Sequence, residues 1–119
     1  MTKSQRIKLR ELLRETVLTR DKGCCRRCGN TMQLAPSHIY PKGKYPRMEF
    51  DLDNVLTLCY RCHIIWWHKN PIEACEWINS ILSLKIKERL KLRTQIIEYG
   101  SQDAAAIALY LKEEKKKYA

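Results

Sequence analysis

Two Cys-x-x-Cys pairs constrain this chain more than any other feature. Cys25 and Cys28 form the first pair and Cys59 and Cys62 the second, with 30 residues (29 to 58) between the pairs. Each pair lets two sulfurs reach one ion from a tight turn, and four thiolates complete a tetrahedral zinc site. We therefore predict a structural Zn²⁺ that clamps both ends of the intervening segment and, being closed, has no position for a substrate.

The other two cysteines receive different predictions. Cys24 is an alternative partner for Cys28 with one more spacer residue, but the two-residue spacing favours Cys25. Cys75 falls in a predicted helix, where we expect a buried, small apolar side chain rather than a ligand. The N-terminus lacks the apolar stretch of a secretory signal and no window resembles a membrane span, so we expect a soluble, cytoplasmic protein in which cysteines bind metal instead of forming disulfides.

Length and charge narrow the class of protein. The 119 residues fit a single domain, which we divide into an N-terminal helix (1–20), a zinc-bearing core (21–70) and C-terminal helices (71–119). Lys and Arg number 23 and Asp and Glu 13, a formal net charge of +10. Such an excess attracts polyanions, and nucleic acid is the commonest. Solubility alone is the other explanation, and an anionic membrane surface is a weaker one, because no polybasic run lies on an amphipathic terminal anchor.

The pattern of apolar residues predicts the order of elements. A basic amphipathic helix runs from Ser4, its expected cap, to Arg20. It either covers the domain or places Arg6, Arg10 or Arg14 against phosphates. Strands at 34–40, interrupted by Pro36, and at 55–58 are joined by a loop and followed by a helix at 63–69. One further helix begins at Pro71, a helix or broken helix runs through 86–97, and a last helix spans about 104–116 after a break at 100–103.

Three polar side chains lie where the zinc pairs would fix them. His38 is inside the clamped segment, Asn54 precedes the second strand, and His63 directly follows Cys62. A His of near-neutral pKa can take a proton from water as it attacks phosphorus, provided that a divalent cation neutralises the phosphate. His63 could bind that cation, and Asn54 could hold the loop around His38 or touch the metal.

These residues resemble a known motif. Ser37-His38-Ile39, Asn54 and the run from Leu58 to His63 resemble the HNH motif of the ββα-metal nucleases, in the branch that carries flanking cysteine pairs. More narrowly, the runs 38–44, 50–54 and 59–62 resemble the phage recombination nucleases of the NinG (Rap) type, over about residues 17 to 80 in all.

The resemblance implies an α+β fold, a small ββα-metal core stapled by zinc with flanking N- and C-terminal helices. It also implies a phage- or prophage-encoded enzyme that hydrolyses DNA phosphodiester bonds with one Mg²⁺ or Mn²⁺, by nicking or on branched recombination intermediates. Carried over by position, His38 is the general base, Asn54 the orienting residue and His63 a ligand of the catalytic ion.

The chain departs from the family pattern at Ser37. Many HNH enzymes have Asp or His there as a metal ligand, and Ser is a poor one. The ion could then use His63 together with Asn54, with a carboxylate such as Asp51 or Asp53, or with water and DNA phosphates. His68, five residues after His63, falls off the same face of an α-helix, so we expect it to contact DNA or solvent.

The loop after His38 is a candidate DNA-binding segment. It carries Lys42, Lys44 and Arg47 with Tyr40 and Tyr45 among them. Either the tyrosines stack on bases or they pack within a solvated loop, and Trp66-Trp67 raises the same alternatives, with at least one Trp in the core. Two other functions remain open: a sequence-specific homing or restriction-type HNH enzyme, and a zinc-bearing DNA-binding protein without catalysis, which Ser37 favours. We expect a monomer or homodimer.

Overall fold

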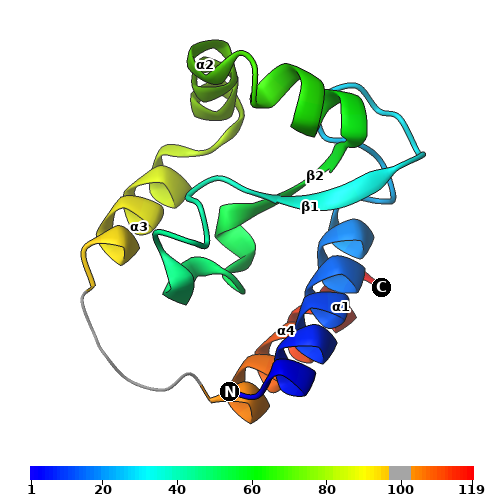
Figure 1. The fold of residues 1–119 in the computed structure, drawn as a ribbon, viewed down its shortest axis with the longest axis vertical. Coiled ribbons are helices and arrows are strands. Elements are labelled where there is room, and N and C mark those ends of the chain that lie inside the picture. The colour runs from blue at the N-terminus through cyan, green and yellow to red at the C-terminus, as the bar shows by residue number, and fades with distance from the viewer. Residues whose placement is uncertain (97–102) are drawn as a thin grey trace.

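A computed structural model describes residues 1–96 and 103–119 and shows a mostly helical α+β domain with one two-stranded antiparallel hairpin (Figure 1). The predicted position Ile97 and most of the break at 100–103 lie outside the described residues. The elements are α1 (Lys3–Arg20), β1 (Leu34–His38), η1 (Pro46–Met48), η2 (Leu52–Asn54), β2 (Val55–Cys59), η3 (Arg61–Trp67), α2 (Pro71–Ile81), α3 (Leu84–Thr94) and α4 (Ala104–Tyr118). None of these helices is long and apolar enough to cross a bilayer.

The N-terminal helix begins earlier than its predicted cap. Thr2, not Ser4, is the N-cap: its side chain accepts a hydrogen bond from the Gln5 N–H, while the Gln5 side chain accepts one from the Thr2 N–H. Both orphan donors are satisfied in this capping box, which moves the start of the helix to Lys3.

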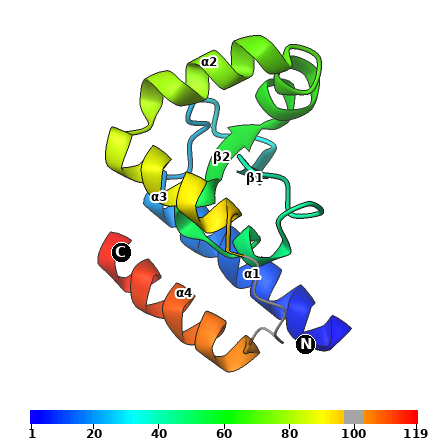
Figure 2. The ribbon, with the colours of Figure 1, turned by 90° about the vertical axis from the view of Figure 1, so that its left-hand side faces the viewer.

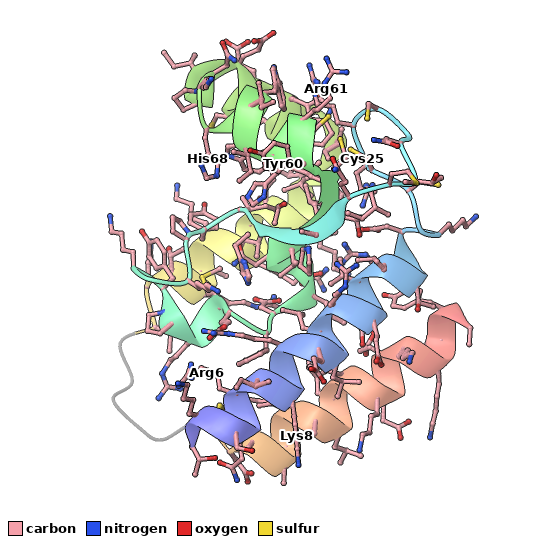
Figure 3. All side chains as sticks on the ribbon, turned by 45° about the vertical axis from the view of Figure 1, so that its right-hand side comes forward. Arg6, Lys8, Cys25, Tyr60, Arg61 and His68 are labelled. Atoms are coloured by element: carbon pink, nitrogen blue, oxygen red, sulfur yellow. The ribbon has the colours of Figure 1, made fainter. Side chains whose placement is uncertain are left out.

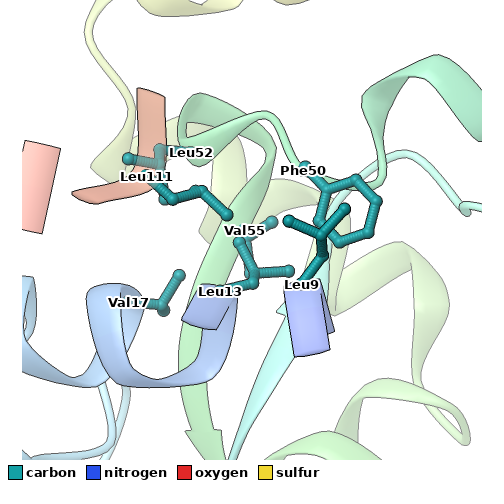
Figure 4. Close-up of a cluster of buried hydrophobic side chains, with 7 residues drawn as sticks. All are labelled: Leu9, Leu13, Val17, Phe50, Leu52, Val55 and Leu111. Atoms are coloured by element: carbon teal, nitrogen blue, oxygen red, sulfur yellow. The ribbon is translucent and has the colours of Figure 1, made fainter. Parts of the chain in front are cut away.

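The main core lies between α1, α4 and the start of β2. In Figure 1, α4 runs beside α1 with both N-termini at the same end, and the salt bridge between Lys115 and Glu15 (3.1 Å) lies near the other end. Figure 4 shows the buried cluster, which consists of Leu9, Leu13, Val17, Phe50, Leu52, Val55 and Leu111. The C-terminal helix thus covers the N-terminal one and completes the core.

The hairpin accommodates a proline because of its register. Pairing runs from Leu34 opposite Cys59 to His38 opposite Val55, which places Pro36 opposite Thr57. Thr57 turns its backbone away from Pro36: its N–H donates to Asp21 (3.0 Å) and its carbonyl accepts from the Arg26 N–H (2.9 Å). The missing proline N–H therefore leaves no ladder bond unmade. The first strand ends at His38, two residues before the predicted end.

A buried ion pair joins α1 to the second strand. Arg20 contacts Asp21 (2.9 Å) and donates to the carbonyls of Leu52 (2.7 Å) and Val55 (2.6 Å). Burial alone would raise the pKa of Asp21, but hydrogen bonds from Arg20 and the Thr57 N–H, with the Arg20 charge, bring it below its usual value of 3.8. The folded protein therefore binds the Asp21 proton more weakly than the unfolded chain does.

We expect Asp21 to make the fold sensitive to acid. Its contribution to stability is complete above the unfolded pKa of 3.8 and is lost as pH falls through the lower, folded pKa. Urea unfolding of the wild type and Asp21→Asn between pH 2.5 and 6 measures this. The free energy of unfolding of the variant should fall less steeply below pH 4, and equal slopes would contradict the assignment.

The remaining helices cover the other side of the hairpin. Figure 2 shows α2 on the opposite side of the strands from α1 and α4, with α3 between. Ala74 and Ile78 of α2 are buried, and Trp77 packs against the cysteine cluster. Cys75 is exposed, so the prediction that it is buried is wrong: it lies one residue from Ala74 and points away from the packed face.

Candidate metal centre and histidine site

Four cysteine sulfurs converge where the hairpin meets the segment after α1. The Sγ atoms of Cys25, Cys28, Cys59 and Cys62 all lie within 4.8 Å of one another, and those of Cys28 and Cys59 are 3.6 Å apart. Bonds of about 2.3 Å to a tetrahedral zinc ion would place sulfurs about 3.8 Å apart, so this donor set fits zinc. Cys24 is outside the cluster, as the spacing predicts. Among residues 1–96 and 103–119, no other group of three or more candidate metal ligands comes together.

The first cysteine turn prepares its sulfur for metal binding. Gly29 has φ +79°, which lets the chain turn back directly after Cys28. Burial would raise the pKa of the Cys25 thiol, but hydrogen bonds from the backbone N–H groups of Cys28, Cys59 and Arg27 lower it to about 7. In the same cluster burial raises the pKa of the Cys62 thiol to about 12, so a bound cation is needed to hold all four sulfurs as thiolates.

Arg27 is a component of this centre that the sequence analysis did not identify. Its Nη1 donates to Cys62 Sγ (3.6 Å), and its guanidinium lies 3.5 Å from the centre of the Trp66 ring. Trp66 in turn meets Trp77 edge-on at 5.8 Å, and Trp67 packs against the cysteine cluster. A cation beside four thiolates offsets their negative charge, and Trp67 and Trp77 cover part of the cluster, in which Cys28 stays exposed.

A backbone carbonyl orients His38. The ring Nε2 lies 2.8 Å from the carbonyl oxygen of Glu49. Because a carbonyl only accepts, Nε2–H is the donor, and in the neutral ring Nδ1 carries the free lone pair. Burial, together with the charges of Lys42 and Arg10, lowers the pKa of His38 below its usual 6.5 despite the opposing effect of Glu49. His38 is therefore a neutral imidazole at pH 7 with one nitrogen available to accept a proton.

The Asn54 side chain holds the loop between Tyr40 and Met48, which follows His38. Its side chain is fully buried: Oδ1 accepts from the Tyr40 N–H (2.8 Å), and Nδ2 donates to the carbonyls of Tyr40 (3.0 Å) and Met48 (3.0 Å). The Asn54 carbonyl also accepts from the Ile39 N–H (2.8 Å). The amide is occupied by backbone on both sides of the loop, which suits an orienting role rather than contact with a metal.

Replacing Asn54 should loosen this loop. Asn54→Ala leaves the partly buried N–H of Tyr40 and the carbonyls of Tyr40 and Met48 without their side-chain partner, and we expect a loss of about 2–5 kcal/mol in the free energy of unfolding. Urea denaturation measures the loss, with Asn79→Ala, an exposed change on α2, as the control. Equal stability of the two variants would show that the amide does not pin the loop.

His63 and His68 lie side by side because η3 is a π-helix. The His68 N–H donates to the His63 carbonyl (3.3 Å), a bond between residues five apart, and the two rings meet edge-on with centres 4.9 Å apart. The prediction that His68 falls off the face of His63 is wrong, because it assumed α-helical geometry. Figure 3 shows His68 on the far side of η3 from Cys25. Burial and the charges of His68 and His38 lower the pKa of His63.

The two candidate carboxylates are engaged elsewhere. Arg93 of α3 contacts both oxygens of Asp51 (2.7 Å each) and one of Asp53 (2.9 Å), and Arg89 lies 3.7 Å from Asp53. These ion pairs fasten α3 to η2. Asp51 and Asp53 are thus both paired with arginines of this chain. This pairing does not favour the alternative in which one of them binds the catalytic ion.

Ser37 is also unusual in its burial and in its hydrogen bonding. It is 1% exposed, and its Oγ is the one buried side-chain oxygen or nitrogen in the described residues without a hydrogen-bond partner. An unpaired buried hydroxyl is costly. The residue that departs from the HNH pattern is therefore also an unsatisfied group.

No family model, curated protein or solved structure matches this chain. Function is therefore inferred from the geometry above and from the motif.

The predicted DNA-binding loop is exposed but internally packed. Lys42, Lys44 and Arg47 are all exposed. Tyr40 and Tyr45 meet edge-on at 5.5 Å, and the Lys44 ammonium lies 5.5 Å from the Tyr45 ring. The tyrosines thus pack within the loop. Binding of DNA by the three cations remains a prediction.

Proposed function

We propose that this protein is a metal-dependent DNA endonuclease of the HNH type, built on a ββα-metal core whose scaffold is held by a four-cysteine zinc site. The observation that carries the proposal is the neutral His38, fixed by the Glu49 carbonyl and paired with Val55 on the strand that leads into η3 and His63. A half-buried imidazole held through one ring nitrogen, with the other free to accept a proton, suits a general base in phosphodiester hydrolysis.

Each residue has a defined part in this proposal. His38 accepts a proton from the attacking water at Nδ1, while Nε2–H stays bonded to Glu49. Asn54 keeps the loop closed around that ring. His63 and His68 would hold a divalent ion, which when bound supplies charge to neutralise the phosphate and the leaving oxygen. Branched DNA as the substrate rests on the narrower motif resemblance.

Plasmid cleavage tests the proposal directly. Zinc-loaded protein is incubated with supercoiled plasmid in Mg²⁺ or Mn²⁺, and in parallel with nicked, flap and four-way substrates. We expect open-circular or linear product that depends on the added ion. Tight binding without any nick would instead support a zinc-bearing DNA-binding protein. Ser37 and the lack of a second group of three ligand side chains among the described residues favour that alternative.

Metal binding by His63 and His68 can be tested separately. Imidazole ligands suit Ni²⁺ better than Mg²⁺, so Ni²⁺ serves as the binding probe. We expect His68→Ala to weaken Ni²⁺ binding by roughly tenfold or more, with zinc content unchanged. Calorimetry measures the affinity, and Lys69→Ala, the exposed neighbour, is the control. Undiminished Ni²⁺ affinity in His68→Ala would exclude His68 as a ligand.

A further inference from the structure

Three cations from two distant segments surround one buried carboxylate next to His38. Glu49 has 3% of its side chain exposed, and its oxygens contact Arg6 (3.1 Å) and Arg10 (2.7 Å) of α1, with Lys42 of the loop at 4.0 Å. One carboxylate therefore faces three positive charges. The cluster, which we call the Glu49 cluster, keeps two positive charges in excess.

The cations of the Glu49 cluster are accessible although the carboxylate is not. The Arg6, Arg10 and Lys42 side chains are 37%, 46% and 48% exposed. Arg6 uses only Nη1 and Arg10 only Nε to bind Glu49, out of five N–H donors on each guanidinium. The remaining donors can reach a ligand oxygen, and the bond to Glu49 has already restricted the rotamers of both side chains.

Glu49 also fixes this cluster relative to His38. Its carboxylate holds the arginines, and its own backbone carbonyl accepts the hydrogen bond from His38. The positive charges and the proposed base are thus positioned by a single buried residue. An anion bound at the arginines would lie beside the His38 ring.

We propose that Arg6, Arg10 and Lys42 form a site for the backbone phosphate of a DNA strand, preorganised by Glu49 and placed next to His38. The proposal rests on the function proposed above and assigns it a substrate-binding surface on α1. Sequence-independent contact with phosphate positions a strand without reading its bases, as a nuclease that recognises DNA shape requires.

The salt dependence of DNA binding tests this site. Binding of a fluorescent 20-base-pair duplex is measured by anisotropy from 50 to 300 mM KCl without Mg²⁺ or Mn²⁺, so cleavage does not interfere. Each lost phosphate contact reduces the slope of log K against log salt by about 1. We expect Arg6→Gln and Arg10→Gln each to do so and to weaken binding roughly fivefold at 150 mM.

Lys8→Gln is the matched control, since Lys8 and Arg6 lie on different sides of the same helix (Figure 3) and the charge removed is equal. Its slope should match that of the wild type. Circular dichroism and zinc content establish that each variant is folded. If all three variants lose the same amount, or the arginine variants lose nothing, there is no site at the Glu49 cluster, while DNA binding by the wild type keeps the nuclease proposal intact. If the wild type binds no DNA, both proposals fail.

Discussion

Replacement of His38 by Gln should abolish DNA cleavage while leaving the protein folded and bound to DNA. The Gln amide can donate to the Glu49 carbonyl in place of Nε2, but it cannot accept a proton from water at neutral pH. General base catalysis contributes about 10²- to 10⁴-fold, so we expect cleavage of supercoiled plasmid to fall by that factor or more. Initial rates of nicking in Mn²⁺ measure the effect.

Three further measurements separate chemistry from structure in this variant. Zinc content, thermal unfolding and duplex affinity should all remain near wild-type values. His38 lies outside the four-cysteine cluster, and the Gln side chain keeps the hydrogen bond to the Glu49 carbonyl. His38→Ala, which loses that bond as well, should be no more active than His38→Gln. A His38→Gln protein that nicks plasmid at the wild-type rate would remove His38 from the mechanism.

Replacement of Cys59 should have the largest effect on stability. Cys59 is buried at the end of β2, and its sulfur lies within the four-cysteine cluster. Zinc binding at structural sites has an apparent free energy of about 10–16 kcal/mol, most of which is folding energy. We expect Cys59→Ser to lose bound zinc and to unfold the hairpin and η3, with loss of DNA binding and cleavage.

The two cysteines outside the cluster provide the controls. Cys24→Ser and Cys75→Ser should each retain one zinc ion per chain and an unchanged melting temperature, because neither sulfur belongs to the cluster. Zinc is measured by atomic absorption and folding by circular dichroism. Zinc retained at full stoichiometry by Cys59→Ser, with unchanged unfolding, would show that the four cysteines do not form the predicted site.

The features of the fold and the site that the sequence predicted correctly are those set by residues close together in the chain. The Cys-x-x-Cys spacing identified the four clustered sulfurs and favoured Cys25 over Cys24, because a two-residue spacer lets two sulfurs reach one ion from a tight turn. Apolar periodicity gave the hairpin and the helices within a few residues of their bounds. The predicted interruption of the first strand at Pro36 is wrong: β1 runs through Pro36, because its partner Thr57 directs its backbone groups away from it, and this pairing could not be read from the sequence.

The errors arise where geometry departs from the regular pattern. The helix that begins at Pro71 was predicted correctly, but Cys75 lies on its outward side, so only the expected burial of this side chain is wrong. His68 failed because the sequence contains no signal that distinguishes a π-helix from an α-helix. In a π-helix the backbone hydrogen bond joins residues five apart instead of four, and this places His68 beside His63.

Ion pairs between distant segments were beyond the sequence altogether. The sequence by itself determined that four thiolates gather, that two short strands precede a helical segment carrying His63, and that the surface is strongly basic. Only the tertiary structure decided that Arg93 takes Asp51 and Asp53, that Arg6 and Arg10 enclose Glu49, and that Glu49 orients His38. The reason is physical: ligand spacing and hydrophobic period act over a few residues, whereas each of these charges has many possible partners until the packing of α1 and α3 selects one.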